Sequence, residues 1–423
     1  MNTIARDIGP LVVEKITQED ILVLTGARQT GKTTFCEQLL PPATGWPYTY
    51  VSFDDPDERL RYQDRGIALL EAVETPLLIL DEVQKIPAVF EHIKVITDRA
   101  RKRGGTPRRR TILTGSSQLL LLKNVRESLA GRAALMHLYP FSLSEVAPAP
   151  PLMALSKIWE AAAFPKSVSN AMNRLSASEI RERMEKAAQH RTWGGFPPVW
   201  ARTGDTARLG WLKDYRRTYL ERDLSDVGQV ADLDAFALAQ KLLCARTAQC
   251  FSLSEVARDL GLAVNTIKRY VRLLELTFQC TLLPPFYENV GKRLIKSPKM
   301  HFLDAGLIRA ILGDLSVSSG ALYESWFAAE LLKWKQLQPL EPELYHYRTA
   351  AGMEVDFILA SNQRLLPIEV KSSARIAAQD GRGVEAFLLE HRTKTSIGIV
   401  AYPGRTIEQI RRHVWAIPDW LLF

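Results

Sequence analysis

Cysteine is scarce in this chain of 423 residues, which contains only Cys36, Cys244, Cys250 and Cys280. No two of them form a C-x-x-C pair, and none belongs to a cluster of histidines and cysteines. The sequence therefore indicates neither a structural zinc site nor a disulfide scaffold.

Long apolar runs are also missing. No stretch reaches the length of a membrane-spanning helix, and Met1–Pro10 lacks the apolar region of a signal peptide. We therefore expect a soluble, cytoplasmic protein of two to four domains without a membrane partner. The formal net charge of +8 and the pI of about 9.2 favour a nucleic-acid partner, although net charge alone is a weak argument.

What the sequence does contain is a phosphate-binding motif. Residues 26–33 match G-x-x-x-x-G-K-[ST], between an apolar run at 21–25 and a helical segment at 35–40. Glycines let the backbone N–H groups of such a loop converge on one anion, and the following helix directs its positive end there. The lysine would reach the β- and γ-phosphates, and the hydroxyl after it would ligate Mg²⁺. The predicted ATP site consists of Gly26, Ala27, Arg28, Gln29, Thr30, Gly31, Lys32, Thr33 and Thr34, with Thr33 as the metal ligand.

Two further strands carry the rest of a hydrolytic site. The apolar run 77–80 ends in Asp81 and Glu82, which would hold Mg²⁺ and polarise the attacking water, respectively. The run 111–114 ends in Thr114, a candidate sensor of the γ-phosphate, with Ser116 close behind. The alternatives are two solvated acids at a strand end and a loop that merely caps the next helix.

Arg132 follows a predicted helix at 118–129 and precedes a strand at 133–139. In AAA-type ATPases the arginine finger sits at this point, so Arg132 is a candidate for contacting the ATP of a neighbouring subunit. A finger acting in trans requires a homo-oligomer. The alternative is an ordinary arginine that complements the helix dipole. Arg222 is a second, weaker candidate.

The middle of the chain predicts a winged helix. Residues 251–262 contain the first helix and the turn, which Gly261 provides. Residues 265–276 form the second helix, and Ile267, Val271 and Leu274 form its buried face. Its outward residues would contact DNA, and the sequence from 280 to 302 would form a basic wing. A rigid lid or a protein-contact module is the alternative. The predicted DNA-binding residues are Asn265, Lys268, Arg269 and Arg272, and the basic residues of the wing are Lys292, Arg293, Lys296 and Lys299.

A second chemical site is predicted near the C-terminus. Strands at 354–359 and 365–371 flank a polar turn, and a two-residue loop at Asn362-Gln363 makes the numbers of facing residues sum to 725. Asp356 then lies opposite Glu369, and Lys371 lies on the same face.

This arrangement matches the D…E-x-K core of PD-(D/E)XK nucleases. Asp356, Glu369 and the Val370 carbonyl would bind Mg²⁺, with Glu324 on a helix at 322–332 as a further acid. Lys371 would position or activate the attacking water. The alternative is a surface hairpin of alternating charges, because D…E-x-K alone is a weak motif.

Taken together, these motifs resemble the bacterial and archaeal ATPases that join an AAA-type P-loop domain to a C-terminal PD-(D/E)XK nuclease-like domain, long catalogued as a domain of unknown function. The segments that carry the resemblance are 26–33, 80–85, 114–117, 128–132, 194–197, 219–223, 354–356 and 367–372. The resemblance implies an α/β chain: a RecA/AAA-like parallel-sheet ATPase core over 1–145, a helical lid over 146–235, a winged helix-turn-helix over 236–305 and an α/β nuclease-like domain over 306–423.

The leading functional prediction is an ATP-hydrolysing enzyme that binds and processes or remodels DNA, with a Mg²⁺-dependent nuclease-like domain. Branched or damaged DNA is the candidate substrate. The alternative is a nucleotide-switched DNA-binding or regulatory protein with a catalytically silent nuclease fold. A signalling ATPase with protein partners alone would show no DNA affinity even at low salt.

Overall fold

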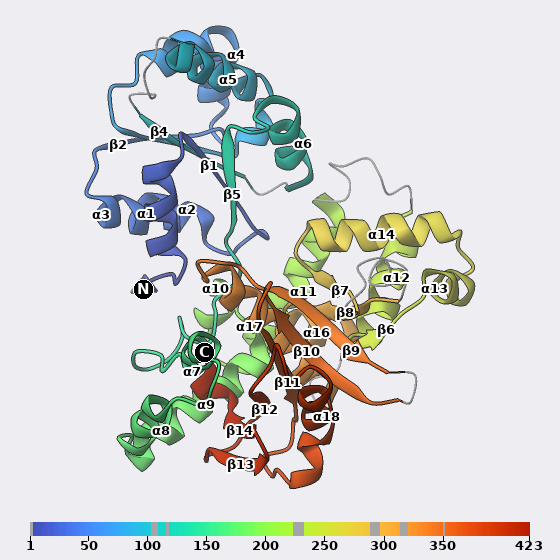
Figure 1. The fold of residues 1–423 in the computed structure, drawn as a ribbon. Helices are drawn as coiled ribbons and strands as arrows, with labels where there is room; N and C mark the ends of the chain where they lie inside the picture. Colours follow the sequence, from blue (N-terminus) through green and yellow to red (C-terminus); the bar gives the residue numbers. More distant parts are fainter. Residues whose placement is uncertain are drawn as a thin grey trace.

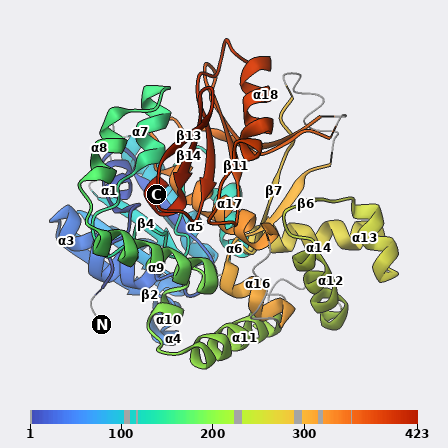
Figure 2. The same ribbon diagram turned by 90° about the horizontal axis from the view of Figure 1, so that it is seen from below.

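The computed structural model describes residues 3–102, 109–115, 118–222, 232–287, 297–313, 320–349 and 352–423. An N-terminal lobe is joined to a larger body that holds the remaining helices and two further sheets (Figures 1 and 2). No helix within these ranges has the length and apolar character needed to cross a membrane.

The N-terminal lobe is built on a five-stranded parallel sheet in the order β2-β3-β4-β1-β5. Every residue of β1 and β3 is buried, because helices cover both faces of a parallel sheet. The predicted parallel sheet is confirmed. Its strands are β1 (Ile21–Thr25), β2 (Tyr48–Ser52), β3 (Leu77–Asp81), β4 (Arg110–Thr114) and β5 (Ala133–His137), and its larger helices are α1 (Gly9–Gln18), α4 (Pro56–Glu71), α5 (Ala88–Lys102) and α6 (Gln118–Ser128).

The chain leaves this lobe after β5 through residues 138–145, which we call the connector. The Phe141 N–H donates to the Gly195 carbonyl at 2.7 Å. The Phe141 carbonyl accepts from His190 Nε2 and from Lys333 Nζ, each at 2.9 Å. The connector is therefore held by elements from two later parts of the chain.

The segment predicted as a lid divides between two neighbours. Helix α9 packs against α16 (Ala305–Leu312) and α19 (Asp419–Leu422), and α7 also contacts α19. Short helix α10 instead lies at the nucleotide loop, since a Cβ on Gly31 would come 4.0 Å from Pro197 Cγ. The helices of this segment are α7 (Ala154–Ala161), α8 (Lys166–Asn173), α9 (Ala177–Trp193), α10 (Pro197–Trp200) and α11 (Asp205–Arg222).

The segment predicted as a winged helix, residues 233–302, is called the winged-helix segment. Its described residues, 233–287 and 297–302, form three helices and an antiparallel sheet in the order β6-β8-β7. Ile267, Val271 and Leu274 are buried, as predicted. The wing residues Lys292, Arg293 and Lys296 lie outside the described part of the chain. The elements are α12 (Leu233–Ala245), β6 (Gln249–Cys250), α13 (Leu253–Leu260), α14 (Val264–Leu276), β7 (Cys280–Leu283) and β8 (Lys299–Phe302).

The C-terminal domain is a six-stranded mixed sheet in the order β13-β14-β12-β11-β10-β9. Successive residues of β10 face opposite sides: Phe357 packs in the core with α17, and Ile358 packs in the core with α18. Its elements are α17 (Gly320–Gln336), β9 (Glu343–Arg348), β10 (Glu354–Ala360), β11 (Leu365–Val370), α18 (Arg382–Glu390), β12 (Gly398–Tyr402), β13 (Glu408–Arg411) and β14 (Val414–Pro418).

The predicted hairpin register is confirmed. Phe357 faces Ile368 and Ala360 faces Leu365, so that each pair sums to 725. Ser361 and Arg364 pair through both backbone N–H groups across the two-residue loop.

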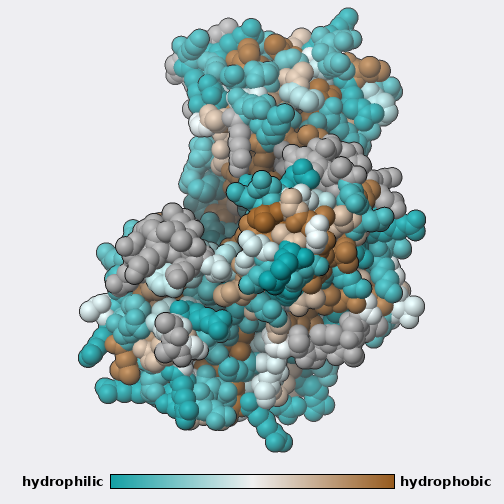
Figure 3. Space-filling view, turned by 90° about the vertical axis from the view of Figure 1, so that its right-hand side faces the viewer, coloured by the Kyte–Doolittle hydropathy of each residue, from teal (hydrophilic) through white to brown (hydrophobic). Residues whose placement is uncertain are grey.

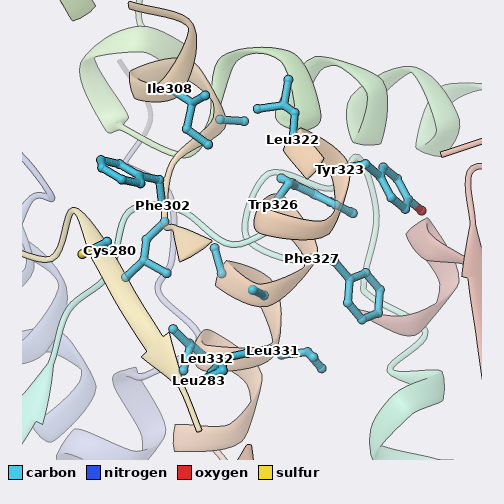
Figure 4. Packing of buried hydrophobic residues seen from close by; sticks show 14 of the residues in the cluster. Cys280, Leu283, Phe302, Ile308, Leu322, Tyr323, Trp326, Phe327, Leu331 and Leu332 are labelled. Atoms are coloured by element: carbon cyan, nitrogen blue, oxygen red, sulfur yellow. The ribbon is translucent and has the colours of Figure 1, made fainter. Parts of the chain in front are cut away.

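The winged-helix segment and the C-terminal domain share one core. In Figure 4, Cys280, Leu283 and Phe302 face α17, whose Phe327 and Leu331 lie in the same hydrophobic cluster. The chain after β7 also pairs with β9, since Phe286 N–H donates to the His346 carbonyl at 2.6 Å and His346 N–H to the Pro284 carbonyl at 3.1 Å. Helix α17 is buried along most of its length because it packs between these two units.

The contact between Gly195 and the connector allows no side chain. A Cβ on Gly195 would come 2.2 Å from the Phe141 carbonyl oxygen, whereas one on exposed Gly210 in α11 would meet nothing within 4 Å. We expect Gly195→Ala to lower the free energy of unfolding by about 1–3 kcal/mol, and Gly210→Ala to raise it by about 0.5–1 kcal/mol through helix propensity. Denaturant unfolding of the full chain measures both, and equal stabilities of the two variants would contradict the packing.

His190 makes the stability of the connector depend on pH. Its Nδ1 accepts from Trp326 Nε1 at 2.8 Å, so Nε2 carries the proton given to Phe141. Burial lowers the pKa of His190 to about 4. The unfolded chain therefore takes up this proton first as pH falls, and a contribution of about 3 kcal/mol that is complete above pH 6.5 is lost towards pH 4.

We expect His190→Gln to flatten this dependence when unfolding is measured between pH 7 and pH 4. His413→Gln, at an exposed histidine, is the control and should keep the slope of the unmodified chain. An unchanged slope in His190→Gln would show that this imidazole is not the titrating group.

Candidate functional site

The lysine of the nucleotide loop is hydrogen-bonded to the backbone of the same loop. Lys32 Nζ donates to the carbonyl oxygens of Gly26 and Ala27 at 2.9 and 2.8 Å. The ammonium is buried, and this burial lowers its pKa to about 8. Gly31 has φ +90° and Gln29 φ +63°, the left-handed conformations that bend the loop. Among the described residues Lys32 has no carboxylate within ion-pair distance, a setting that a bound anion would relieve.

Thr33 and Asp81, the residues predicted to hold Mg²⁺ at the nucleotide loop, contact each other in the structure. The Thr33 hydroxyl donates to Asp81 Oδ2 at 2.9 Å. Tyr50 on β2 donates to the same oxygen at 2.8 Å, and burial raises the pKa of Asp81. The sequence analysis missed Tyr50, because strand order alone brings β2 beside β3.

Glu82 and Thr114 lie at the tips of neighbouring strands β3 and β4. Glu82 has a left-handed backbone at φ +53° and accepts from Gln84 Nε2. Among the described residues, neither Thr114 Oγ1 nor Gln84 Oε1 has a hydrogen-bond partner, and both atoms are buried. Unpaired polar atoms at a phosphate loop fit a site that a ligand completes. Ser116, the second sensor candidate, lies outside the described residues.

Arg6 joins the nucleotide loop to the connector, and no sequence pattern singled it out. Its Nη1 donates to the Thr30 carbonyl at 2.8 Å, and its Nη2 donates to the Tyr139 carbonyl. Its Nε pairs with Glu145 Oε2 at 3.0 Å, and both side chains are buried. Because Arg6 binds both segments, a movement of the nucleotide loop would displace the connector directly.

A cavity of about 440 Å³ opens beside the loop. Its wall is mainly apolar and includes helix α10, which supplies Pro197 and Trp200. Because it adjoins the phosphate loop, it has the place and character of a pocket for a nucleoside. It is lined by Thr3, Ile4, Arg6, Thr30, Gly31, Thr34, Gln38, Leu39, Phe141, Pro197, Trp200 and Ala201.

Arg132, the finger candidate, is held within its own chain. Its Nε and Nη2 bind Asp98 Oδ1 and Oδ2 at 2.8 and 3.1 Å. A role in trans would require this two-pronged pair to open. The side chain of Arg222 lies outside the described part of the structure.

The second predicted site contains an unexpected cation. Lys299 is not on the outside of the wing, where we predicted it, because β8 turns its side chain into the C-terminal domain. Its Nζ lies 2.6 Å from Glu324 Oε1, 3.1 Å from Glu354 Oε1 and 3.5 Å from Asp356 Oδ1, and the side chain is 4% exposed. Burial favours the neutral amine, but the attraction of Glu324 and then Asp356 outweighs it and raises the pKa of Lys299.

The remaining predicted residues lie beside this group. Asp356 Oδ2 accepts from the Val370 N–H at 2.9 Å, and Glu369 Oε1 binds Lys371 Nζ at 2.7 Å. Burial raises the pKa of Asp356, and burial followed by the charge of Asp356 raises that of Glu369 to about 7. The sequence thus correctly placed these groups near one another.

The predicted metal site does not fit this arrangement. Among the described residues, no three Asp, Glu, His or Cys side chains are disposed to hold a metal ion. The acids Glu324 and Asp356 turn instead towards the ammonium of Lys299. We therefore derive no metal chemistry at Glu324, Asp356, Glu369 and Val370.

The predicted DNA-binding residues share one exposed helix face. Asn265, Lys268, Arg269 and Arg272 on α14 are all exposed. Figure 3 views the molecule from the side on which α14 lies. Arg272 has a carboxylate neighbour, Glu275 Oε2, at 3.8 Å. Loss of that distant contact would cost little on binding a phosphate.

Known protein families match three parts of the chain. A family described as an AAA domain matches residues 18–147. Two families described as domains of unknown function, DUF8612 and DUF4143, match residues 184–317 and 319–422. The N-terminal lobe is therefore an AAA-type P-loop ATPase domain. The AAA part of the resemblance is confirmed, and the nuclease-like part stays a prediction.

Relatives span almost the whole chain. An uncharacterized protein of Mycobacterium tuberculosis, Rv2008c, is 26% identical over 420 residues, which are 95% of this chain and 84% of the relative. An uncharacterized protein of Methanocaldococcus jannaschii, MJ1544, is 23% identical over 96% of this chain and 88% of the relative.

Two solved structures resemble part of the chain. The Holliday junction branch migration motor RuvB of Thermotoga maritima has 15% identity and a TM-score of 0.28, over 66% of this chain and 90% of that chain. The replication initiator DnaA bound to AMPPCP and single-stranded DNA has 16% identity and a TM-score of 0.27, over 65% and 90%.

Proposed function

We propose that the chain is an ATP-hydrolysing protein that binds DNA and carries a nuclease-like C-terminal domain. The observation that best supports the ATPase is the direct contact of Thr33 with Asp81 beside the buried ammonium of Lys32. Lys32 and Thr33 lie in the helical turn 32–34 that follows the loop, and Asp81 ends strand β3. Together they have the chemistry that a nucleotide with Mg²⁺ requires.

Each residue has a defined task in this proposal. Lys32 and the loop N–H groups bind phosphates, while Thr33 and Asp81 would hold Mg²⁺, which neutralises phosphate charge when bound. Glu82 orients water, and Thr114 donates its unpaired hydroxyl to the reacting phosphate. The cavity by Trp200 receives the nucleoside. Arg132 acts on a neighbouring subunit of a homo-oligomer after it leaves Asp98.

Substitution of Lys32 and Thr114 separates nucleotide binding from hydrolysis. We expect Lys32→Ala to abolish ATP binding. Thr114→Val should keep binding, slow hydrolysis by about 10²-fold and leave the unfolding free energy within about 1 kcal/mol, because its hydroxyl has no partner to lose. Fluorescent-nucleotide titration, phosphate release and thermal unfolding measure the three effects. Full hydrolysis by Thr114→Val would remove this residue from the mechanism.

DNA binding is proposed for the exposed face of α14. Three cations and an amide on one helix suit phosphate and base-edge contacts. In a winged-helix arrangement the second helix of the helix-turn-helix is the one that enters the major groove, and α14 is that helix here. The net charge of +8 favours the same partner.

A salt titration tests this face. We expect Lys268→Ala with Arg269→Ala to weaken DNA binding and to reduce the slope of log K against log salt concentration by about 1.8, if each contacts one phosphate. Arg181→Ala with Lys213→Ala removes the same charge from exposed positions on α9 and α11 and should leave the slope unchanged. Equal losses in both pairs would mean that only net charge matters.

The nuclease-like assignment of the C-terminal domain is supported by element order and register. Helix α17, the antiparallel strands β9 to β11, helix α18 and parallel strand β12 follow one another in the order of the PD-(D/E)XK fold. The observed register ends at Phe357 and Ile368, and its continuation by one residue would put Asp356 opposite Glu369. The internal Lys299 favours the second candidate function, a nucleotide-switched DNA-binding protein whose nuclease fold is silent.

A further inference from the structure

Lys299 takes up the space and the ligand atoms that a metal ion would need. A divalent cation binds carboxylate oxygens at about 2.0–2.6 Å. The Lys299 ammonium already lies 2.6 Å from Glu324 Oε1 and 3.5 Å from Asp356 Oδ1. A metal ion bound to the same two oxygens would be pressed against a like charge, which is strongly unfavourable at a buried site.

Two of the other ligand atoms are also engaged. Asp356 Oδ2 accepts the Val370 N–H, and Glu369 Oε1 is paired with Lys371. Glu369 Oε2 is buried and has no hydrogen-bond partner among the described residues, so one oxygen remains for a cation once the Lys299 ammonium is removed. The Lys299 ammonium thus compensates the charges of Glu324 and Asp356, while Lys371 compensates the charge of Glu369.

The lysine is fixed in place by the shared core. It lies on β8 between β6 and β7, and its neighbours Met300 and Phe302 are buried. The Thr247 and Ser325 hydroxyls are hydrogen-bonded at 2.7 Å across the same contact. Withdrawing Lys299 would require β8 to separate from α17, which would expose this apolar packing to water.

From this geometry we infer that Lys299 is a built-in replacement for the metal of the C-terminal site. The unmodified chain binds no divalent cation at Glu324, Asp356 and Glu369, and it does not cut DNA there by metal catalysis. Removal of the ammonium opens a latent divalent-cation site between the freed carboxylates. The inference rests on the nuclease-like fold proposed above, but not on ATP hydrolysis.

Manganese binding to the full chain without nucleotide tests this inference. Electron paramagnetic resonance counts bound Mn²⁺ for the unmodified chain, Lys299→Met, and Lys299→Met with Asp356→Asn. Methionine retains the length of the side chain without its charge. Lys268→Met, at an exposed lysine of α14, is the matched control. Any manganese at the nucleotide loop is common to all four proteins and cancels in the comparison.

We expect Lys299→Met to bind one more manganese ion per chain, at least about tenfold more tightly than the unmodified chain binds any ion there. Added Mn²⁺ should also raise the melting temperature of this variant. Asp356→Asn should remove both effects, and Lys268→Met should show neither. A folded Lys299→Met protein without the extra ion would overturn the inference.

A second comparison needs no change at Lys299. The unmodified chain and its Asp356→Asn variant should bind the same amount of manganese. If the unmodified chain holds an ion that Asp356→Asn loses, a metal ion displaces Lys299 and the inference is wrong. Because nucleotide is absent throughout, a failure of the ATPase proposal leaves this outcome unaffected.

Discussion

The backbone of Phe141 is the point on which the assembly of this molecule depends. Its N–H and its carbonyl bind the Gly195 turn and His190, which lie at one end of helix α9, and Lys333, which comes much later in the sequence. The buried Phe141 carbonyl is stabilised by its two donors, His190 and Lys333. The buried ammonium of Lys333 in turn needs a hydrogen-bond acceptor such as this carbonyl. These mutual requirements fix the connector between the ATPase lobe and the body.

The same connector contacts the nucleotide loop through Arg6 and the C-terminal domain through α17. Glu330 accepts from the Leu143 N–H at 2.7 Å and binds Lys333 at 2.6 Å. Glu324, the partner of Lys299, is on the same helix, about 9 Å away along its axis at 1.5 Å per residue. A rigid helix therefore links the connector to the carboxylate cluster, so a nucleotide-driven shift of the lobe would reach the winged-helix contact through packing.

Local sequence patterns predicted the features that depend on residues close together in the chain. Apolar runs gave the buried strands β1 and β3, and a two-residue loop gave the register whose continuation would put Asp356 opposite Glu369. Tyr50, Arg6 and Lys299 could not be found in this way, because each contacts groups from elements distant in sequence. Their roles follow from the strand order and from the packing of β8 on α17. Neither of these can be predicted from the spacing of residues in the sequence.

Lys299 shows why an intact motif is weaker support for chemistry than for fold. The burial of carboxylates can be compensated by a metal ion or by ammonium groups, since either offsets the desolvation of the carboxylates. A sequence retains Asp356, Glu369 and Lys371 in both cases. What distinguishes them is a lysine 57 residues before Asp356 in the chain, which only the shared core brings to the site. If Lys299 replaces the metal as we propose, the C-terminal domain would serve as an anchoring surface for the winged-helix segment, and the chemistry would be confined to the nucleotide loop.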